Sequence, residues 1–162
     1  QIGNLPSLAK LIGNTVVCDF RIQDVKFNGQ GAPLVPIGDR LLFSGYDNCI
    51  NLGGFANISS EEDNKRIAYD ICPVNIVMNR FAKKLGYDYD KGGDIAKSGN
   101  VDHSLLKLLN EISYYAHKPP KSLGLEWVES QVFPILESSK ISEENILRTF
   151  VEHIAVQIAN AF

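Results

Sequence analysis

The stretch from Asp47 to Asn79 constrains the fold most, because it combines extended segments, a glycine turn and a proline break. Runs of β-forming residues flank Gly53-Gly54, which predicts a hairpin. A polar SEEDNK connection then leads into a third extended run that carries Asp70 near its end. Pro73 stops that run, and apolar residues continue at helical spacing. The expected strands are 48–52, 55–59 and 66–71, and the expected helix carries Ile76, Val77, Phe81 and Leu85.

The chain before this stretch is harder to interpret. Residues 7–12 predict a short helix between Pro6 and Gly13, and residues 15–20 (TVVCDF) read as a short buried strand. Residues 21–39 carry three glycines and two prolines, so we expect little regular structure there. Residues 34–45 are apolar and are expected to be partly helical.

The chain after Phe81 is expected to be mainly helical. Gly86 should end the first helix, and Asp102 and Ser142 are typical N-cap residues for two later ones. Further helical turns are expected at residues 95–96 and 127–136. Strands first and helices later, with one strand-to-helix crossover, predict a single α/β domain with a mixed sheet.

Composition excludes several classes of function. The 162 residues suffice for one domain, and 44% hydrophobic and 22% charged residues are typical of a soluble globular protein. A net charge of −3 does not favour nucleic-acid binding. The sequence has no apolar run long enough for a membrane span and no signal-peptide pattern. The three cysteines are odd in number and lack metal-ligand spacing, which suits a reducing compartment such as the cytoplasm.

Both ends of the chain indicate a piece of a longer protein. The chain opens on Gln1 rather than on methionine, and Phe162 lies inside an apolar helical pattern with no stop signal.

Asp70 is the first candidate for chemistry, because it lies where a strand ends and a helix is about to begin. A carboxylate at such a position can act as a general base, or it can cap the following helix. Cys72 lies two residues further on and would share a strand face with Asp70 in an extended chain, although a buried, inert thiol is its simpler role.

A second candidate site lies in the segment Gly29-Gln30-Gly31-Ala32-Pro33, together with Arg21 and Asp24. Charged and amide groups bind sugar hydroxyls, and glycines let the backbone join in. The alternative is a tight structural turn with a surface ion pair. No metal site is expected: residues 88–99 begin like a calcium loop, but Gly92 and Gly99 stand where oxygen ligands are needed. The three histidines, His103, His117 and His153, form no ligand pair.

Five segments, in order, resemble one known family. They are VVCDFRIQDVKFNGQGAPLVP, INLGGFANIS, YDICPVN, YDYDKGGDIAKSG and PPKSLGLEW, and together they are similar to anhydro-N-acetylmuramic acid kinase. The resemblance covers nearly the whole chain. It implies a ribonuclease-H-like (actin-like ATPase) fold with a mixed sheet and flanking helices, of which this chain is the central part of a two-lobed kinase.

The resemblance also implies an activity. Such kinases use ATP with Mg²⁺ to open the 1,6-anhydro bond of anhydro-N-acetylmuramic acid and form N-acetylmuramic acid 6-phosphate in peptidoglycan recycling. The expected partners are this small sugar and ATP, and the protein could form a homodimer. The alternatives are a non-catalytic sugar-binding module or scaffold of the same fold, and a hydrolase that uses Asp70 without ATP.

Family roles carry over to individual positions of this chain. Asp70 matches the catalytic base, and Asn75 closes the same motif. The phosphate-binding motif matches at Gly53, Gly54 and Asn57. The expected sugar-binding set is Arg21, Asp24, Gly29, Gln30, Gly31 and Asn75. The block from Lys121 to Glu126 matches a family segment of unassigned role.

The chain departs from the family pattern in two ways. Its Asp70-to-Asn75 motif reads DICPVN where the family has Asp-Thr-Gly-Pro-Gly-Asn, and Leu123 and Leu125 replace Thr and Arg. The first phosphate loop and the adenosine-binding segment of the family lie outside these residues. We therefore expect the 162 residues alone to lack kinase activity.

Overall fold

A computed structural model describes residues 5–29, 31 and 34–162 of the chain. Gln30, one of the residues expected in the sugar pocket, lies outside the described residues.

The hairpin and the third strand form as expected. β1 (Asn48–Leu52), β2 (Phe55–Glu62) and β3 (Lys65–Pro73) make a three-stranded sheet in the order β1-β2-β3. β2 runs into the segment expected as a connection, which shrinks to a turn at Asp63 and Asn64. Both turn residues have positive φ, as a tight hairpin turn requires. Each neighbouring pair of strands is antiparallel, so in the described part of the chain the sheet is antiparallel rather than mixed.

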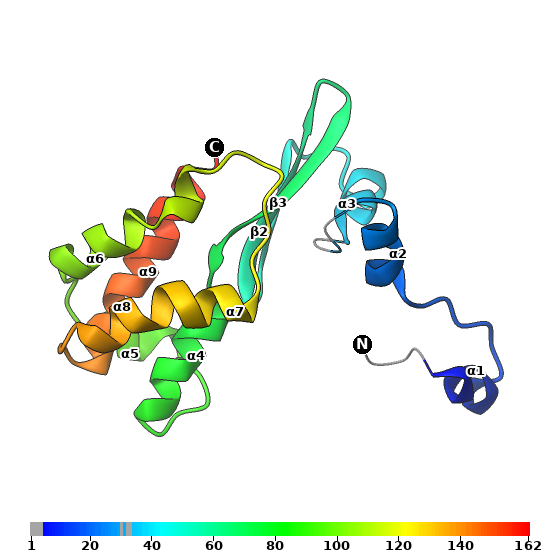
Figure 1. The fold of residues 1–162 in the computed structure, drawn as a ribbon. Helices are drawn as coiled ribbons and strands as arrows, with labels where there is room; N and C mark the ends of the chain where they lie inside the picture. Colours follow the sequence, from blue (N-terminus) through cyan, green and yellow to red (C-terminus); the bar gives the residue numbers. More distant parts are fainter. Residues whose placement is uncertain (1–4, 30, 32–33) are drawn as a thin grey trace.

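Helices cover one face of this sheet, as Figure 1 shows. The regular helices here are α4 (Asn75–Lys84), α5 (Asp94–Ser98), α6 (His103–Asn110) and α9 (Glu143–Ala159), with 3₁₀ turns η1 (Lys91–Gly93) and η2 (Ser113–Ala116). The end of α4 is a Schellman motif: Gly86 has φ of 87°, and the N–H groups of Gly86 and Tyr87 donate to the carbonyls of Lys83 and Ala82. Asp102 caps α6 through the Leu105 N–H, and Ser142 caps α9 through the Asn145 N–H, as expected.

The helix expected at 127–136 is present but interrupted. It is built from α7 (Leu125–Trp127), a π-helical turn η3 (Val128–Val132) and α8 (Phe133–Ser138). Pro134 lacks an N–H, and its ring would clash with the carbonyl one turn earlier in a regular helix. The wider π turn just before Pro134 relieves that conflict.

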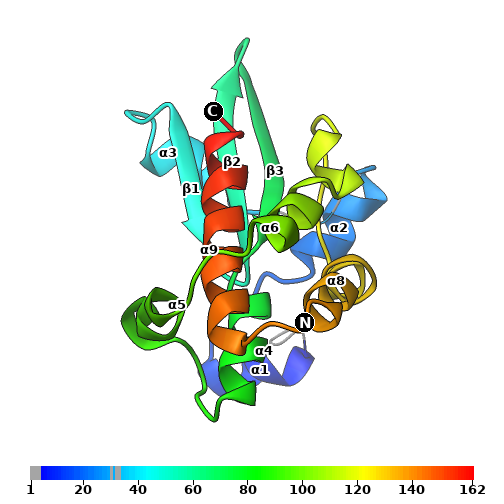
Figure 2. The same cartoon turned by 90° about the vertical axis from the view of Figure 1, so that its left-hand side faces the viewer.

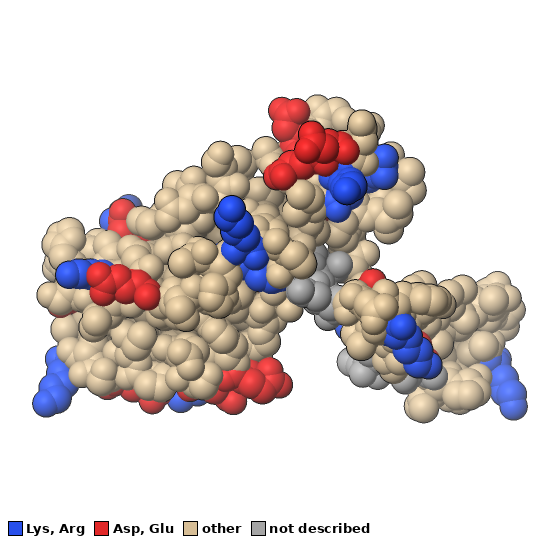
Figure 3. Space-filling model, turned by 45° about the horizontal axis from the view of Figure 1, so that its top comes forward, with Lys and Arg blue, Asp and Glu red and all other residues tan. Residues whose placement is uncertain are grey.

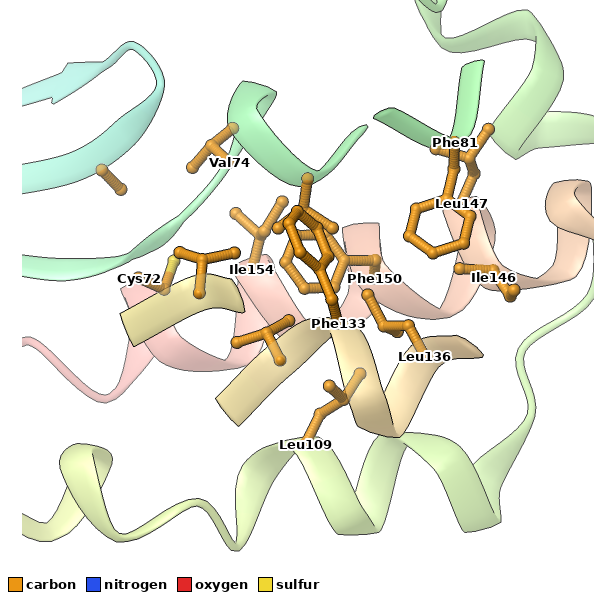
Figure 4. Close-up of a cluster of buried hydrophobic side chains, with 14 of the residues drawn as sticks. Cys72, Val74, Phe81, Leu109, Phe133, Leu136, Ile146, Leu147, Phe150 and Ile154 are labelled. Carbon is orange, nitrogen blue, oxygen red and sulfur yellow. The ribbon is translucent and has the colours of Figure 1, made fainter. Parts of the chain in front are cut away.

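The core lies between the sheet and these helices. In Figure 2, α9 runs across the face of the sheet, and in Figure 4 Phe133 and Phe150 meet at the centre of the cluster. Burial of each large apolar side chain contributes about 1.5–3 kcal/mol. The largest fully buried side chains include Phe81, Leu109, Leu136, Leu147 and Phe150.

The N-terminal part contributes little to this core. α1 (Pro6–Ile12), α2 (Phe20–Lys26) and α3 (Pro36–Leu42) contain no buried residue. The prediction of a buried strand at 15–20 is wrong: residues 15–19 have no regular structure and Phe20 begins α2. A strand forms only beside a partner strand, and residues 15–19 pair with none of the described strands. The prediction that residues 21–39 lack regular structure is wrong where α2 lies. The expectation that residues 34–45 are partly helical is confirmed by α3.

α3 lies on the sheet face opposite the core helices, as Figure 1 shows. A chain of polar contacts holds it there. Ser59 Oγ donates to Asp39 Oδ2 on α3 at 2.5 Å, and Arg66 Nη2 donates to Ser59 Oγ at 2.9 Å. Arg66 also lies 4.0 Å from Asp39 and 3.9 Å from Glu61. Asp39, which these contacts hold, lines the cavity described below.

None of the helices in the described part of the chain combines the length and apolar character of a membrane span. Lysine and arginine side chains are scattered over the face in Figure 3 and form no continuous basic patch among the described residues on that face.

Candidate active site

A β-bulge in β3 determines where Asp70 points. Asn57 pairs with Asp70, whereas the preceding residue Ala56 pairs with Cys72, so Ile71 is an extra residue in β3. Paired residues of antiparallel strands lie on the same face. Cys72 therefore lies with Ala56 in the core, and Asp70 lies with Asn57 on the opposite face. The expectation that Asp70 and Cys72 share a face is wrong, because the bulge breaks the alternation.

Asp70 is 5% exposed and is held by hydrogen bonds to described residues outside the sheet. Its N–H donates to the Lys121 carbonyl at 3.2 Å, and its carbonyl accepts from the Tyr114 hydroxyl at 2.6 Å. Its Oδ2 accepts from the Leu123 N–H at 2.8 Å. No described residue donates a hydrogen bond to Oδ1, and the Asp70 side chain lines an open cavity.

Asp70 does not cap α4. The N-cap residue of that helix is Val74, with no side-chain cap. The first N–H groups of α4 are instead taken by the glycine turn: those of Val74 and Ile76 donate to the Gly54 carbonyl. The helix-cap alternative for Asp70 is therefore contradicted.

The surroundings of Asp70 have opposing effects on the pKa of its carboxyl group. Burial raises the pKa of the Asp70 carboxyl, while the Leu123 N–H and the nearby Arg21 guanidinium lower it. The net pKa lies above the ordinary value for an aspartate. A carboxylate with a raised pKa is a better proton acceptor than a free aspartate, as a general base requires.

The cavity in front of Asp70 has a volume of about 640 Å³. β1, β2 and β3 form its floor, and α2, α3 and the segment before α3 form its sides. Charged, amide and apolar groups all contribute, a mixture that suits a sugar-sized ligand. The lining residues are Arg21, Leu34, Val35, Asp39, Cys49, Ile50, Asn51, Gly54, Phe55, Asn57, Asp70 and Leu123.

The Gly53-Gly54 turn borders this cavity and a second one along α4. Gly54 lines both, and a Cβ built on it would meet no atom within 4 Å. Asn75 fixes the turn, because its N–H and its Nδ2 both donate to the Gly53 carbonyl, the latter at 2.9 Å. The open space at Gly54 leaves room for a phosphate group to approach the backbone.

The loop before α3 is held by the two charged residues of α2. Arg21 Nη1 donates to the Gly31 carbonyl, and the Gly31 N–H donates to Asp24 Oδ2 at 2.7 Å. Gly31 has φ of 71°, which favours glycine. The carboxylate of Asp24 lies so close to Gly29 that a Cβ there would be 2.2 Å from Oδ2. Asp24 thus has a structural role in the loop, and Arg21 both holds the loop and lines the cavity.

The structure brings together only part of the site that the sequence indicates. Asp70, Arg21, Asn57 and Gly54 line one cavity, whereas Asn75 lines the neighbouring one along α4. Asp24 lines a third cavity between α2 and α3. Asn57, expected at the ATP phosphates, lies directly beside Asp70.

Sequence reasoning missed Asp39, Leu123 and Tyr114. The only signal for any of them was the block from Lys121 to Glu126, which resembles the family and whose role is now visible. Lys121 and Leu123 bind the backbone and side chain of Asp70.

Within the described residues, no group of three or more His, Cys, Asp or Glu side chains could hold a metal ion. The cysteines Cys18, Cys49 and Cys72 are free, and burial raises the pKa of the Cys72 thiol to about 12. A thiol that stays protonated is neither a metal ligand nor a nucleophile.

Comparisons with known proteins point to one family. The family model described as anhydro-N-acetylmuramic acid kinase matches residues 1–162. A protein of that name from Pseudomonas fluorescens (strain Pf0-1) is 39% identical over 171 residues, covering 99% of this chain and 46% of the relative. The namesake from Vibrio cholerae is 37% identical over 168 residues, covering 98% of this chain and 44% of the relative. The chain thus spans about half the length of the curated relatives it matches.

Proposed function

Because the chain belongs to the anhydro-N-acetylmuramic acid kinase family, we propose that it supplies the general base and the sugar pocket of an ATP-dependent kinase for 1,6-anhydro-N-acetylmuramic acid. The observation that carries the proposal is the setting of Asp70. Its Oδ2 is bound by the Leu123 N–H, and its side chain lines a cavity of about 640 Å³ together with Arg21 and Asn57.

The proposed reaction begins with proton removal. Asp70 Oδ1 accepts a proton from a water molecule as that water attacks the anomeric carbon of the sugar. The anhydro C–O bond breaks, and the oxygen released at the sixth position accepts the γ-phosphoryl group. The products are N-acetylmuramic acid 6-phosphate and ADP. The raised pKa of Asp70 favours the first step, because a more basic carboxylate takes the proton more readily.

The side chains around Asp70 bind and orient the sugar in this proposal. Arg21 provides charge-assisted hydrogen bonds to a polar group of the sugar, and Asn57 lies beside Asp70 with an amide that can donate and accept. Asp24 lies in α2 and binds the Gly31 N–H, and its carboxylate packs against Gly29. In this proposal these three residues act on the sugar indirectly, through the loop that Arg21 also holds.

The Gly53-Gly54 turn is the proposed contact for the nucleotide. The carbonyls of the turn are already bound by the N–H groups of α4 and by Asn75, so the turn is rigid before a ligand arrives. When bound, ATP supplies the phosphoryl group and Mg²⁺ neutralises phosphate charge. We propose no Mg²⁺ ligand from the described residues.

Three broader expectations stay proposals. They are a ribonuclease-H-like, actin-like fold for the complete protein, a cytoplasmic location and a homodimer. A family of kinases that act on a small sugar supports the first two, and nothing described above bears on the third.

The test is an assay of the complete natural protein with 1,6-anhydro-N-acetylmuramic acid, ATP and Mg²⁺, with ADP and sugar phosphate measured in parallel. The proposal expects equal amounts of both products. Ring opening without ATP would instead indicate a hydrolase, and sugar binding without turnover would indicate a binding module. Either result would overturn the proposed function.

A further inference from the structure

Asp70 is fixed by residues that lie far from it in the sequence. The segment from Lys121 to Leu123 supplies one backbone acceptor and one backbone donor, and Tyr114 supplies a hydroxyl. Among the described residues, the Leu123 N–H is the one hydrogen-bond donor to the carboxylate itself. The direction of the Asp70 side chain therefore depends on how firmly the segment 121–123 is held against β3.

Tyr114 holds that segment as well as Asp70. The Lys121 ammonium donates to the Tyr114 carbonyl at 3.4 Å and lies 4.7 Å from the centroid of the Tyr114 ring. The ring is 6% exposed and packs 5.2 Å from the Trp127 ring. One residue thus contacts the backbone of Asp70 on one side and the segment that carries Leu123 on the other.

We infer that Tyr114 is a positioning residue for Asp70. Its hydroxyl and ring keep the segment 121–123 against β3, so that the Leu123 N–H stays on Oδ2 and Oδ1 faces the cavity. The inference rests on the proposed function, because orientation matters for turnover only if Asp70 is the base.

Loss of this support has two expected effects. A displacement of about 1 Å in a reacting group can lower a rate by roughly a hundredfold. A weaker bond from Leu123 removes an interaction that favours the charged carboxylate, so the acid limb of the pH–rate profile moves to higher pH. Among the described residues, the other charged or titratable groups around Asp70 are Arg21 from α2, Asp39 from α3, Cys49 from β1, and Lys121. They are unchanged in the variant proposed below.

The experiment compares Tyr114→Phe with Tyr115→Phe in the complete natural protein. Tyr115 is the matched control, because its hydroxyl is also in the interior but lies 2.9 Å from His153 Nε2 instead of bonding Asp70. Each variant loses one hydroxyl group, and the two lost hydrogen bonds should contribute similarly to the free energy of unfolding. We expect Tyr114→Phe to lower kcat roughly tenfold to a hundredfold with little change in KM for the sugar, and to shift the acid limb upward. Tyr115→Phe should leave both kcat and the limb near those of the wild type.

Equal kcat and equal acid limbs in the two variants would overturn the inference. A second measurement is independent of turnover: ¹³C NMR titration of the Asp70 carboxyl, which should move to a higher pKa in Tyr114→Phe alone. An inactive wild-type protein with this shift would reject the proposed function and keep the positioning role. If Tyr114→Phe does not fold, Trp127→Leu removes the ring that packs 5.2 Å from the Tyr114 ring and changes no charge near Asp70. It should shift the same titration in the same direction, and an unchanged titration in that variant would also overturn the inference.

Discussion

The amide nitrogen of Leu123 lies 2.8 Å from Oδ2 of Asp70, although the two residues are 53 positions apart in the sequence. This contact gives the two carboxylate oxygens different roles. Oδ2 is bound by the protein, and we expect Oδ1 to act on a ligand in the cavity that Asp70 lines together with Arg21 and Asn57. A general base needs such an arrangement, because its basic oxygen must be both oriented and accessible.

Replacement of Arg21 should weaken sugar binding and also change the pH dependence. A charge-assisted hydrogen bond is worth about 1.5–3 kcal/mol, so Arg21→Ala should raise KM for the sugar by roughly tenfold to a hundredfold. In the wild type the positive charge of Arg21 lowers the pKa of Asp70. Without that charge the pKa of Asp70 rises, so the acid limb of the pH–rate profile should move to higher pH. Steady-state kinetics across pH measures both effects. Arg40→Ala is the control, since the Arg40 side chain is about half exposed, forms an ion pair with Glu61 at 3.5 Å and is not among the described residues that line the cavity. Unchanged sugar kinetics in a folded Arg21→Ala protein would leave Arg21 with a purely structural role.

Replacement of Gly29 should act on the same loop indirectly. The new Cβ in Gly29→Ala would lie 2.2 Å from Asp24 Oδ2, so the carboxylate must leave the Gly31 N–H that it binds. Loosening of the loop that Arg21 holds should raise KM for the sugar severalfold and lower the melting temperature. Gly45→Ala is the matched control, because a Cβ there meets no atom within 4 Å. If the two alanine variants behave alike, the loop does not depend on Gly29.

His153 should make the stability of the chain depend on pH. The residue is 0% exposed, and its ring nitrogens lie 2.6 Å from Asn110 Oδ1 and 2.9 Å from the Tyr115 hydroxyl. Burial lowers its pKa from 6.5 to about 4. Below pH 6.5 His153 is protonated in the unfolded chain but stays neutral in the folded chain. The free energy of unfolding therefore decreases as pH falls from about 6.5 toward 4.

Urea unfolding at pH 7.5 and pH 5 tests this. By this linkage His153 should account for a loss of about 2 kcal/mol between the two conditions. That share should disappear in His153→Gln, whose overall stability will also be lower. His103→Gln, at an exposed position, should keep the wild-type pH dependence. A pH dependence that survives in His153→Gln would show that another group is responsible.

Local signals in the sequence predicted most of the elements. The glycine turn at Gly53-Gly54, the stop at Gly86 and the caps at Asp102 and Ser142 are each specified by a few neighbouring residues, and all are confirmed. The strand expected at residues 15–20 failed because a strand depends on a partner, and a local pattern cannot reveal whether one is present. α2 was missed because the glycines and prolines that follow it dominated the interpretation of its segment.

The site itself could be predicted only in part. Asp70 and Arg21 were found, but their surroundings arise from contacts between distant segments. The bulge at Ile71 is one extra residue in one strand, which becomes visible only when β3 is aligned with β2. The contacts of Tyr114 and Leu123 with Asp70 likewise join residues that are 44 and 53 positions apart in the sequence. No periodicity in the sequence could indicate them.

The role of Asp70 as general base is tested by kcat of Asp70→Asn in the complete natural protein, with anhydro-N-acetylmuramic acid and ATP. Asparagine keeps an oxygen that can accept the Leu123 N–H, so the melting temperature and sugar binding should stay close to those of the wild type. It lacks the basic oxygen, and a general base contributes about 10²–10⁴-fold in rate. We therefore predict that kcat falls at least about a hundredfold. A decrease of about threefold or less would be far smaller than a general base contributes and would show that Asp70 is not the base.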